Sequence, residues 1–134
     1  TKLCGERLIL EDNSNNLVIR SNVIYDYNIN TQASFLNWVL NSLNNNQNIK
    51  VVKEQINNPI WAESLAKIIV KCIEQNIHGV VHWGGADYIN RYDFAIKIAN
   101  IFNLDHTLIQ PIDTKELNQV AKRPLNSGLK TNLS

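Results

Sequence analysis

The sequence predicts an α/β fold with largely parallel strands, and two features of the chain carry that prediction. Short apolar runs at residues 17–19, 49–52 and 80–83 are typical of strands buried on both faces of a parallel sheet. Between them lie longer segments whose apolar residues recur at helical spacing, as in βαβ units. With 134 residues, 44% of them hydrophobic, the chain is long enough for one modest domain with a core.

The chain is expected to open within a helix over residues 2–11. Leucine and isoleucine side chains give this segment an apolar face, and the polar residues 12–15 end it. The strand at 17–19 follows, and Ile24 and Tyr25 come shortly after it. Because the chain opens inside a helix and stops on a polar tail, we expect it to be part of a larger protein.

A second helix is predicted after a polar loop that extends through Thr31. Phe35, Val39 and Leu43 recur at helical spacing, and a run of asparagines ends the helix. We interpret the asparagine clusters as loop fillers and compositional bias. The β-branched strand at 49–52 comes next.

A third helix is predicted to begin at Pro59, because proline fits the first helical position, where its missing N–H costs nothing. A wide apolar stripe predicts that this helix packs on a sheet. The stripe consists of Leu65, Ile68, Ile69, Cys72 and Ile73. Gly79 is expected to close the helix in the left-handed conformation, and the strand at 80–83 follows until two glycines stop it.

The last predicted helix begins at Asn90, which forms a capping box with Asp93. Phenylalanine and isoleucine side chains continue down one face of this helix. A short strand at residues 108–109 is expected before Pro111. The tail over residues 122–134 is predicted to be irregular, because proline and glycine interrupt it.

Charge, cysteine and histidine content narrow the classes of partner. The formal net charge is +1, so no basic face for nucleic acid is indicated. Cys4 and Cys72 lack the spacing of a disulfide framework, which suits a reducing cytoplasm. His78 and His106 have no metal-ligand spacing, and we assign no metal site. No apolar run approaches the roughly 20 residues of a membrane span, so we expect a cytoplasmic protein with no nucleic-acid or membrane partner.

The polar loop between the strand at 49–52 and the third helix is the first candidate ligand site. In open α/β sheets, ligands bind just beyond the carboxyl ends of strands. Asn57 and Asn58 suit a turn there, because their short side chains bond the local backbone and tolerate unusual φ.

Several motifs of the chain, taken in order, resemble the extended short-chain dehydrogenases. Residues 1–6 look like the second half of that family's Tyr-x-x-x-Lys helix, and residues 20–25 resemble its strand exit Arg-Thr-Ser-x-Val-Tyr-Gly. Residues 54–60 resemble the Asp-Gln-x-x-x-Pro-Thr of the dTDP-4-dehydrorhamnose reductases within it. Three further segments, residues 82–85, 92–95 and 123–129, follow in the same order. Residues 82–83 and 101–104 are similar to a related branch, the regulatory β subunit of methionine adenosyltransferase.

The resemblance covers essentially the whole chain but only the carboxyl-terminal half of the family's proteins. It implies an α/β unit, the C-terminal part of an extended short-chain dehydrogenase (Rossmann-like) fold that is incomplete at the N-terminal side. Within residues 1–134, the end of the catalytic helix would occupy 1–11 and the substrate-binding elements mainly 26–134. The N-terminal dinucleotide-binding half would be absent, and NADP or NAD would be bound mainly by that missing half.

Two residues are implied to serve the cofactor. Lys2 matches the lysine that binds the nicotinamide ribose and lowers the pKa of a tyrosine, which protonates the substrate carbonyl as hydride arrives. That tyrosine would lie before Thr1, and the alternative for Lys2 is a solvated helix lysine. Ile24 lies where the family's backbone passes the nicotinamide, and its side chain is interpreted as part of the core.

Five residues are implied to face the substrate: Ser34, Phe35, Gln55, Pro59 and Arg123. Ser34 and Phe35 match an Asn-Phe pair near the nucleotide, although we favour Phe35 as a core anchor over a base-stacking ring. The Gln55 amide supplies a donor and an acceptor for a sugar hydroxyl or a pyrimidine edge, or it stabilises the turn. The N–H groups after Pro59 are predicted to meet a diphosphate at the positive end of the helix. Arg123 either clamps a phosphate or ties down the tail.

The resemblance implies the substrate-binding half of an NAD(P)-dependent reductase that acts on a 4-keto-6-deoxy nucleotide sugar in dTDP-rhamnose biosynthesis. Val23 and Ile60 depart from the tryptophan and threonine of the rhamnose-forming reductases. The alternatives are a non-catalytic regulatory relative with a synthetase partner and an α/β domain without a ligand. The expected partner is the nucleotide sugar, and a homodimer is left open. The fragment alone is expected to have no activity.

Overall fold

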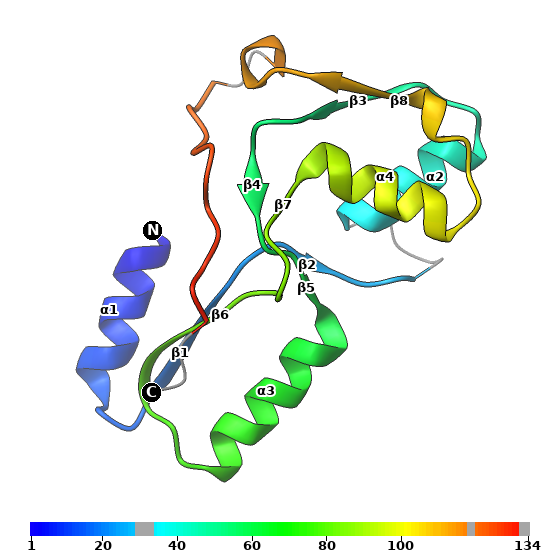
Figure 1. Ribbon diagram of the computed structural model, residues 1–134. Helices are drawn as coiled ribbons and strands as arrows, with labels where there is room; N and C mark the ends of the chain where they lie inside the picture. Colours follow the sequence, from blue (N-terminus) through cyan, green and yellow to red (C-terminus); the bar gives the residue numbers. More distant parts are fainter. Residues whose placement is uncertain (29–33, 118–119, 132–134) are drawn as a thin grey trace.

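The computed structural model describes residues 1–28, 34–117 and 120–131 and has an α/β architecture (Figure 1). The helices are α1 (Lys2–Asp12), α2 (Phe35–Asn44), α3 (Ala62–Glu74) and α4 (Arg91–Ile101). The strands are β1 (Leu17–Ser21), β2 (Ile24–Tyr25), β3 (Ile49–Val52), β4 (Ile56–Asn57), β5 (Ile60–Trp61), β6 (Gly79–Trp83), β7 (Ile89–Asn90) and β8 (Ile109–Ile112). Short 3₁₀ helices, His106–Leu108 and Thr114–Leu117, flank β8. The end of the predicted polar loop, through Thr31, lies outside the described residues.

The strands of the described chain form parallel pairs with one exception, which confirms the predicted parallel α/β class. β1 pairs with β6 from Leu17 opposite Gly79 to Ser21 opposite Trp83. β2 pairs with β5, and β3 with β8, in the same parallel sense. The antiparallel pair is β4 with β7. The short pairs lie between the two longer ones, so they connect the part that contains α1 and α3 to the part that contains α2 and α4 (Figure 1).

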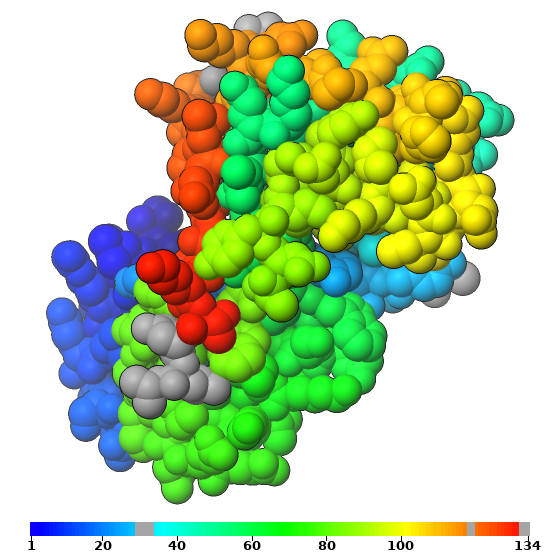
Figure 2. Space-filling view, in the orientation of Figure 1, coloured from blue at the N-terminus to red at the C-terminus, as the bar shows by residue number. Residues whose placement is uncertain are grey.

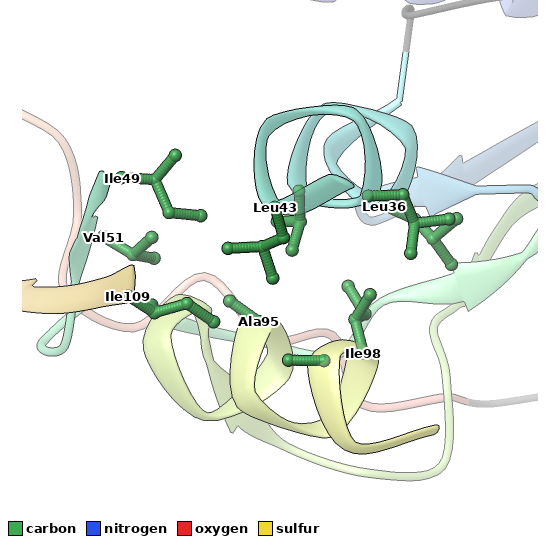
Figure 3. Close-up of a cluster of buried hydrophobic side chains, with 10 residues drawn as sticks. Leu36, Leu43, Ile49, Val51, Ala95, Ile98 and Ile109 are labelled. Carbon is green, nitrogen blue, oxygen red and sulfur yellow. The ribbon is translucent and has the colours of Figure 1, made fainter. Parts of the chain in front are cut away.

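The hydrophobic core lies between α2, α4 and the β3–β8 pair (Figure 3). Its buried members are Leu36, Val39, Leu40, Leu43, Ile49, Val51, Ala95, Ile98, Ala99 and Ile109. The α2 members recur at three- and four-residue spacing and so occupy one face of the helix. Each large aliphatic side chain that is fully buried contributes about 1.5–3 kcal/mol to stability, which makes this cluster the main support of α2 and α4.

α1 is joined to the β1–β6 pair by a polar cluster rather than by apolar burial. Arg20 on β1 donates through Nε to Glu6 Oε2 at 2.9 Å, and its Nη1 lies 3.2 Å from His82 Nε2 on β6. The hydrogen bonds from Arg20 lower the pKa of the Glu6 carboxyl below its ordinary value. This cluster fixes the helix that carries Lys2. Within the described ranges every helix is too short and too polar to cross a bilayer.

The predicted start of the third helix is wrong. α3 begins at Ala62, and Ile60 and Trp61 form β5 instead. The Ile60 N–H donates to the carbonyl oxygen of Val23 at 2.9 Å, which continues the parallel pairing with β2. Pairing with a neighbouring strand therefore outweighs the preference of Pro59 for a first helical position. The protein itself uses the Ile60 N–H, whereas a diphosphate contact of the N–H groups at the start of the helix stays a prediction.

The predicted closure of α3 by Gly79 is also wrong. The left-handed residue after the helix is Asn76, with φ of 50°, whereas Gly79, with φ of 82°, opens β6. Asn46 and Asn103 adopt the same conformation after α2 and α4, with φ of 53° and 54°. Asparagine enters this region more readily than most residues with a Cβ. One asparagine of the clusters that we interpreted as filler, Asn46, therefore ends a helix.

Three further expectations are corrected by burial and strand pairing. Of the predicted α3 stripe, Cys72 is buried, whereas Ile69 and Ile73 are exposed because the described residues do not cover that face. Ile24 is 49% exposed and so does not belong to the core. Pro111 lies within β8 rather than after it. Among the described residues, β3 is the one strand that pairs with β8. The edge of β8 at which Pro111 lacks an N–H can therefore face away from β3.

Candidate functional site

Asn58 joins three other segments of the chain through its buried side chain, which is 1% exposed. Its Oδ1 accepts from Asn22 Nδ2 and from the Leu129 N–H, both at 2.9 Å. Its Nδ2 donates to the carbonyl oxygens of Gly85 at 3.0 Å and Leu129 at 2.9 Å. The amide thus uses both of its donors and both lone-pair sites of its oxygen. Asn58 is a structural centre rather than a simple turn residue.

Gly84 and Gly85, which stop β6, are required by the close approach of the loop that contains Asn58. A Cβ on Gly84 would overlap the Asn58 amide, and one on Gly85 would overlap the carbonyl oxygen of Pro59. The Gly85 N–H also donates to the Asn58 carbonyl oxygen at 3.0 Å. The glycine pair therefore allows two backbone segments to touch, which fixes the loop that precedes β5.

We expect Gly85→Ala to lower the free energy of unfolding by about 3 kcal/mol, because the added methyl group collides with backbone that cannot move aside. Urea unfolding of the purified protein measures the loss. Gly5→Ala on α1 is the matched control, because a methyl group there meets nothing within 4 Å. Alanine is favoured over glycine in a helix interior by about 1 kcal/mol, so the control should be neutral or stabilising. Equal losses in the two variants would contradict the close approach.

The segment 120–131 runs along the surface and is hydrogen-bonded to β4 (Figure 2). The Ile56 N–H donates to the Leu125 carbonyl oxygen at 2.7 Å, and the Ser127 N–H donates to the Ile56 carbonyl oxygen at 3.0 Å. This pairing lays residues 125–127 beside β4, which begins directly after Gln55, and Arg123 lies two residues before the paired stretch. Arg123 also lines a groove of about 570 Å³, whose other lining residues include Glu54, Lys115 and Lys122.

The Gln55 side chain is buried, with 6% of its surface exposed. Its Nε2 has no hydrogen-bond partner in the part of the chain that the structure describes. A buried donor without an acceptor costs about 1–3 kcal/mol, and such groups are uncommon in native proteins. Since the Nε2 donor bonds no described residue, the alternative of a turn-stabilising glutamine gains no support from this donor. An oxygen of a bound ligand would accept a hydrogen bond from it.

Ser34 and Phe35 have structural roles at the start of α2. Ser34 Oγ caps the helix by accepting from the Asn37 N–H at 3.2 Å. The Phe35 ring is stacked on Phe94 with 5.7 Å between ring centres, and it lies 5.6 Å from the ring of Trp38. These contacts agree with the core anchor that we favoured for Phe35. A contact of either residue with a nucleotide stays a prediction.

The structure adds Arg91, which the sequence analysis did not select. It follows the predicted capping box, in which Asn90 Oδ1 accepts from the Asp93 N–H and Asn90 Nδ2 donates to Asp93 Oδ2, both at 2.7 Å. The centre of its guanidinium lies 6.0 Å from the centre of the Phe35 ring. Desolvation by the surrounding protein and the nearby Arg123 lower the pKa of Arg91. The sequence did offer one signal for Arg91. It places a cation in the first turn of a helix, where anions are favoured.

The remaining predicted residues lie elsewhere. Lys2 is exposed on the first turn of α1 and makes no ion pair within the described residues. Ile24 lies opposite Ile60 in the β2–β5 pair, which brings it close to Pro59. Pro59 lines a cavity of about 570 Å³ together with aromatic side chains from β2, β5 and β6. Roles in cofactor or substrate binding for these three residues stay predictions.

Metal ligands and thiols add nothing to this site. Across residues 1–28, 34–117 and 120–131, no three His, Cys, Asp or Glu side chains converge as metal ligands. Cys4 is an exposed free thiol, and Cys72 is a buried one. His78 Nδ1 lies 2.7 Å from the carbonyl oxygen of Asn15, which gives that ring a structural contact.

The parallel strand pairs and the helices that connect them define an α/β domain. A family model described as the RmlD substrate binding domain matches residues 1–134. The chain therefore belongs to this family, and the resemblance drawn from its motifs is confirmed.

Relatives of the chain include members of both groups that the motifs indicated. The dTDP-4-dehydrorhamnose reductase of Aggregatibacter actinomycetemcomitans is 28% identical over 96% of this chain and 47% of its own length. Methionine adenosyltransferase 2 subunit beta of Xenopus laevis is 27% identical over 96% of this chain and 40% of its own length. A solved dTDP-4-dehydrorhamnose reductase from Bacillus anthracis, in complex with NADP, is 25% identical with a TM-score of 0.89, covering 98% of this chain and 45% of that one. The chain spans less than half the length of these relatives.

Proposed function

We propose that the intact protein is an NAD(P)-dependent reductase of a 4-keto-6-deoxy nucleotide sugar and that this chain is its substrate-binding part. The observation that carries the proposal is the buried Gln55 amide, whose Nε2 donor has no hydrogen-bond partner within the described residues and which directly precedes β4. A buried donor that lacks an acceptor suits a polar ligand with a free oxygen. Membership of a substrate-binding family makes a nucleotide sugar the best candidate for that ligand.

In this proposal the residues divide between cofactor and substrate. When bound, the cofactor supplies the hydride that reaches the carbonyl carbon of the sugar. Lys2 binds the nicotinamide ribose and lowers the pKa of a tyrosine outside these 134 residues, which gives its proton to the carbonyl oxygen. The exposed ammonium of Lys2, which has no ion-pair partner within the described ranges, supports this role. Residues 26–134 supply the substrate contacts, while the cofactor is held mainly elsewhere in the intact protein, with the Ile24 backbone beside its nicotinamide.

Isothermal titration calorimetry of the intact protein with NADPH and with NADH tests the reductase proposal. We expect at least one of the two to bind, because hydride transfer requires a bound nicotinamide. The Bacillus anthracis reductase in complex with NADP makes NADPH the first choice. If neither cofactor binds to the folded protein, the reductase proposal is excluded.

A second candidate function is that of a regulatory subunit that binds a synthetase. Val23 and Ile60 support it, because the rhamnose-forming reductases carry tryptophan and threonine at these positions. The 27% identity to methionine adenosyltransferase 2 subunit beta supports it as well. Co-purification of the tagged intact protein with a methionine adenosyltransferase distinguishes the two functions. A stable complex favours regulation, whereas a monomer or homodimer with reductase activity counts against it.

For either function the two free thiols support a cytoplasmic location.

A further inference from the structure

Helix α1 is held to the β1–β6 pair by a cluster of charged and polar side chains. None of the α1 residues is buried, so apolar packing contributes little to the attachment of the helix. Glu6 accepts through both carboxylate oxygens from Nε and Nη2 of Arg20 on β1. The Glu6 side chain is only 16% exposed, so water cannot readily replace this contact. The Arg20 guanidinium therefore anchors α1.

His82 on β6 completes this cluster in one protonation state only. Its Nε2 lies 3.2 Å from Arg20 Nη1, and the β1–β6 register places the two residues opposite each other. A guanidinium group has donors but no acceptor, so His82 Nε2 must accept, which requires a neutral ring with its proton on Nδ1. Protonation of Nε2 would set two donors of like charge against each other, and the contact would break.

A second histidine near α1 makes a contact of the opposite kind. His78 Nδ1 lies 2.7 Å from the carbonyl oxygen of Asn15, in the turn between α1 and β1. A carbonyl oxygen only accepts, so His78 donates, and it keeps this hydrogen bond whether its ring is neutral or protonated. Of the two rings, only that of His82 loses its contact when it takes up a proton.

The charges around His82 favour its neutral ring. β1 contributes Arg20, and α1 contributes Glu6 with Arg7 close to it. The carboxyl-terminal segment, which is hydrogen-bonded to the residue after β6, adds Lys130 next to the residue that makes the bond. α3 lies on the opposite side of the β1–β6 pair, so its charged residues do not face the ring (Figure 1). Glu6 is the acidic group in this set, and both of its oxygens already accept from Arg20.

We propose that Glu6, Arg20 and His82 form a proton-sensitive clamp, which holds α1 against the β1–β6 pair when His82 is neutral and releases it when His82 is protonated. Histidine side chains as a class change charge between about pH 5 and 8. The released state binds the extra proton, so the attachment is complete at the alkaline end of this range and is lost as the pH falls. His82 is thus a positioning residue for α1. Because Lys2 lies one turn before Glu6, the same proton controls the position of Lys2, but the clamp does not depend on the proposed reductase function.

Hydrogen–deuterium exchange of the intact protein at about pH 7.5 and about pH 5.5 tests the clamp, after correction for the intrinsic pH dependence of amide exchange. We expect the α1 amides of the wild type to exchange about threefold or more faster at the lower pH, because the released helix opens more often. His82→Gln, whose amide oxygen accepts from Arg20 but does not titrate, should give slow exchange at both pH values. His82→Lys, which cannot accept, should give fast exchange at both. His78→Gln is the matched control and should keep the wild-type response.

Each outcome of this test decides for or against the clamp. Equal exchange of the wild-type α1 amides at the two pH values would overturn it, and so would a pH response that His82→Gln retains. Loss of the response in His78→Gln would assign it to the other histidine and overturn the clamp as well. The readout needs neither NADPH nor a sugar, so failure of the clamp and failure of the proposed function are distinguishable. Circular dichroism checks the folding of each variant, and His82→Gln keeps the test decisive if His82→Lys unfolds.

Discussion

Replacing Asn58 by alanine is expected to lower the free energy of unfolding by about 3–5 kcal/mol, the largest loss of stability among our predictions. The Asn58 side chain is 1% exposed and makes hydrogen bonds to Asn22, Gly85 and Leu129. Alanine would leave half-buried donors and acceptors of Asn22, Gly85 and Leu129 without the hydrogen bonds that they make to Asn58. Because these partners lie on separate segments, segment 120–131 should also detach from β4. Urea unfolding measures the loss.

Asn100→Ala is the matched control for this prediction. Asn100 is an exposed asparagine on α4, where alanine is a good helix former. Its replacement should change the free energy of unfolding by less than about 0.5 kcal/mol. Asn58→Asp, which keeps an acceptor but removes the Nδ2 donor, should be destabilising as well. A loss for Asn58→Ala no larger than that for Asn100→Ala would show that Asn58 does not hold the segments together.

Replacing Lys2 by methionine is expected to lower kcat of the intact protein by about 100-fold or more, because it removes the cation that lowers the pKa of the tyrosine. Methionine keeps most of the length of the side chain. Since Lys2 is exposed and α1 buries none of its described residues, stability should barely change. The measurement is NADPH consumption with a 4-keto nucleotide sugar. The loss of the remaining activity with rising pH should shift to higher pH, because the tyrosine that donates the proton then has a higher pKa and stays protonated longer.

Lys71→Met, on the exposed side of α3, is the matched control and should retain full turnover. The pH profile separates a role in proton transfer from a structural one, because a merely structural loss would lower activity equally at every pH. Turnover of Lys2→Met equal to that of the wild type would remove Lys2 from the mechanism. In that case the solvated-lysine alternative for this residue would hold.

Elements that depend on nearby residues were predictable from the sequence. The strand Ile49–Val52 was predicted with its observed bounds, because three of its four positions carry β-branched apolar residues and polar residues flank it. The capping box of Asn90 and Asp93 is a contact over three residues and was also predicted. The start of α3 was not, because β5 forms only through its pairing with β2, far earlier in the chain. The conformational preferences of residues 59–62 cannot reveal a pairing strand that lies so much earlier in the chain.

The candidate site divides in the same way. Gln55 and Arg123 were selected because their side chains carry donors suited to sugars and phosphates. Asn58 was interpreted as a turn residue, because its bonds to Leu129 join positions 71 residues apart. Arg91 was not selected, because its contact with the Phe35 ring joins positions that only the folded chain brings together. Residue chemistry was thus predictable, but residue proximity was not.

The most direct test of the nucleotide-sugar site is NADPH oxidation by the intact protein in the presence of a 4-keto-6-deoxy nucleotide sugar. We predict that NADPH is consumed only when both sugar and protein are present, with one NADPH oxidised for each sugar reduced. The same assay with the free sugar, which lacks the diphosphate, should give little consumption. A folded protein that oxidises no NADPH with any such nucleotide sugar would contradict the proposed function.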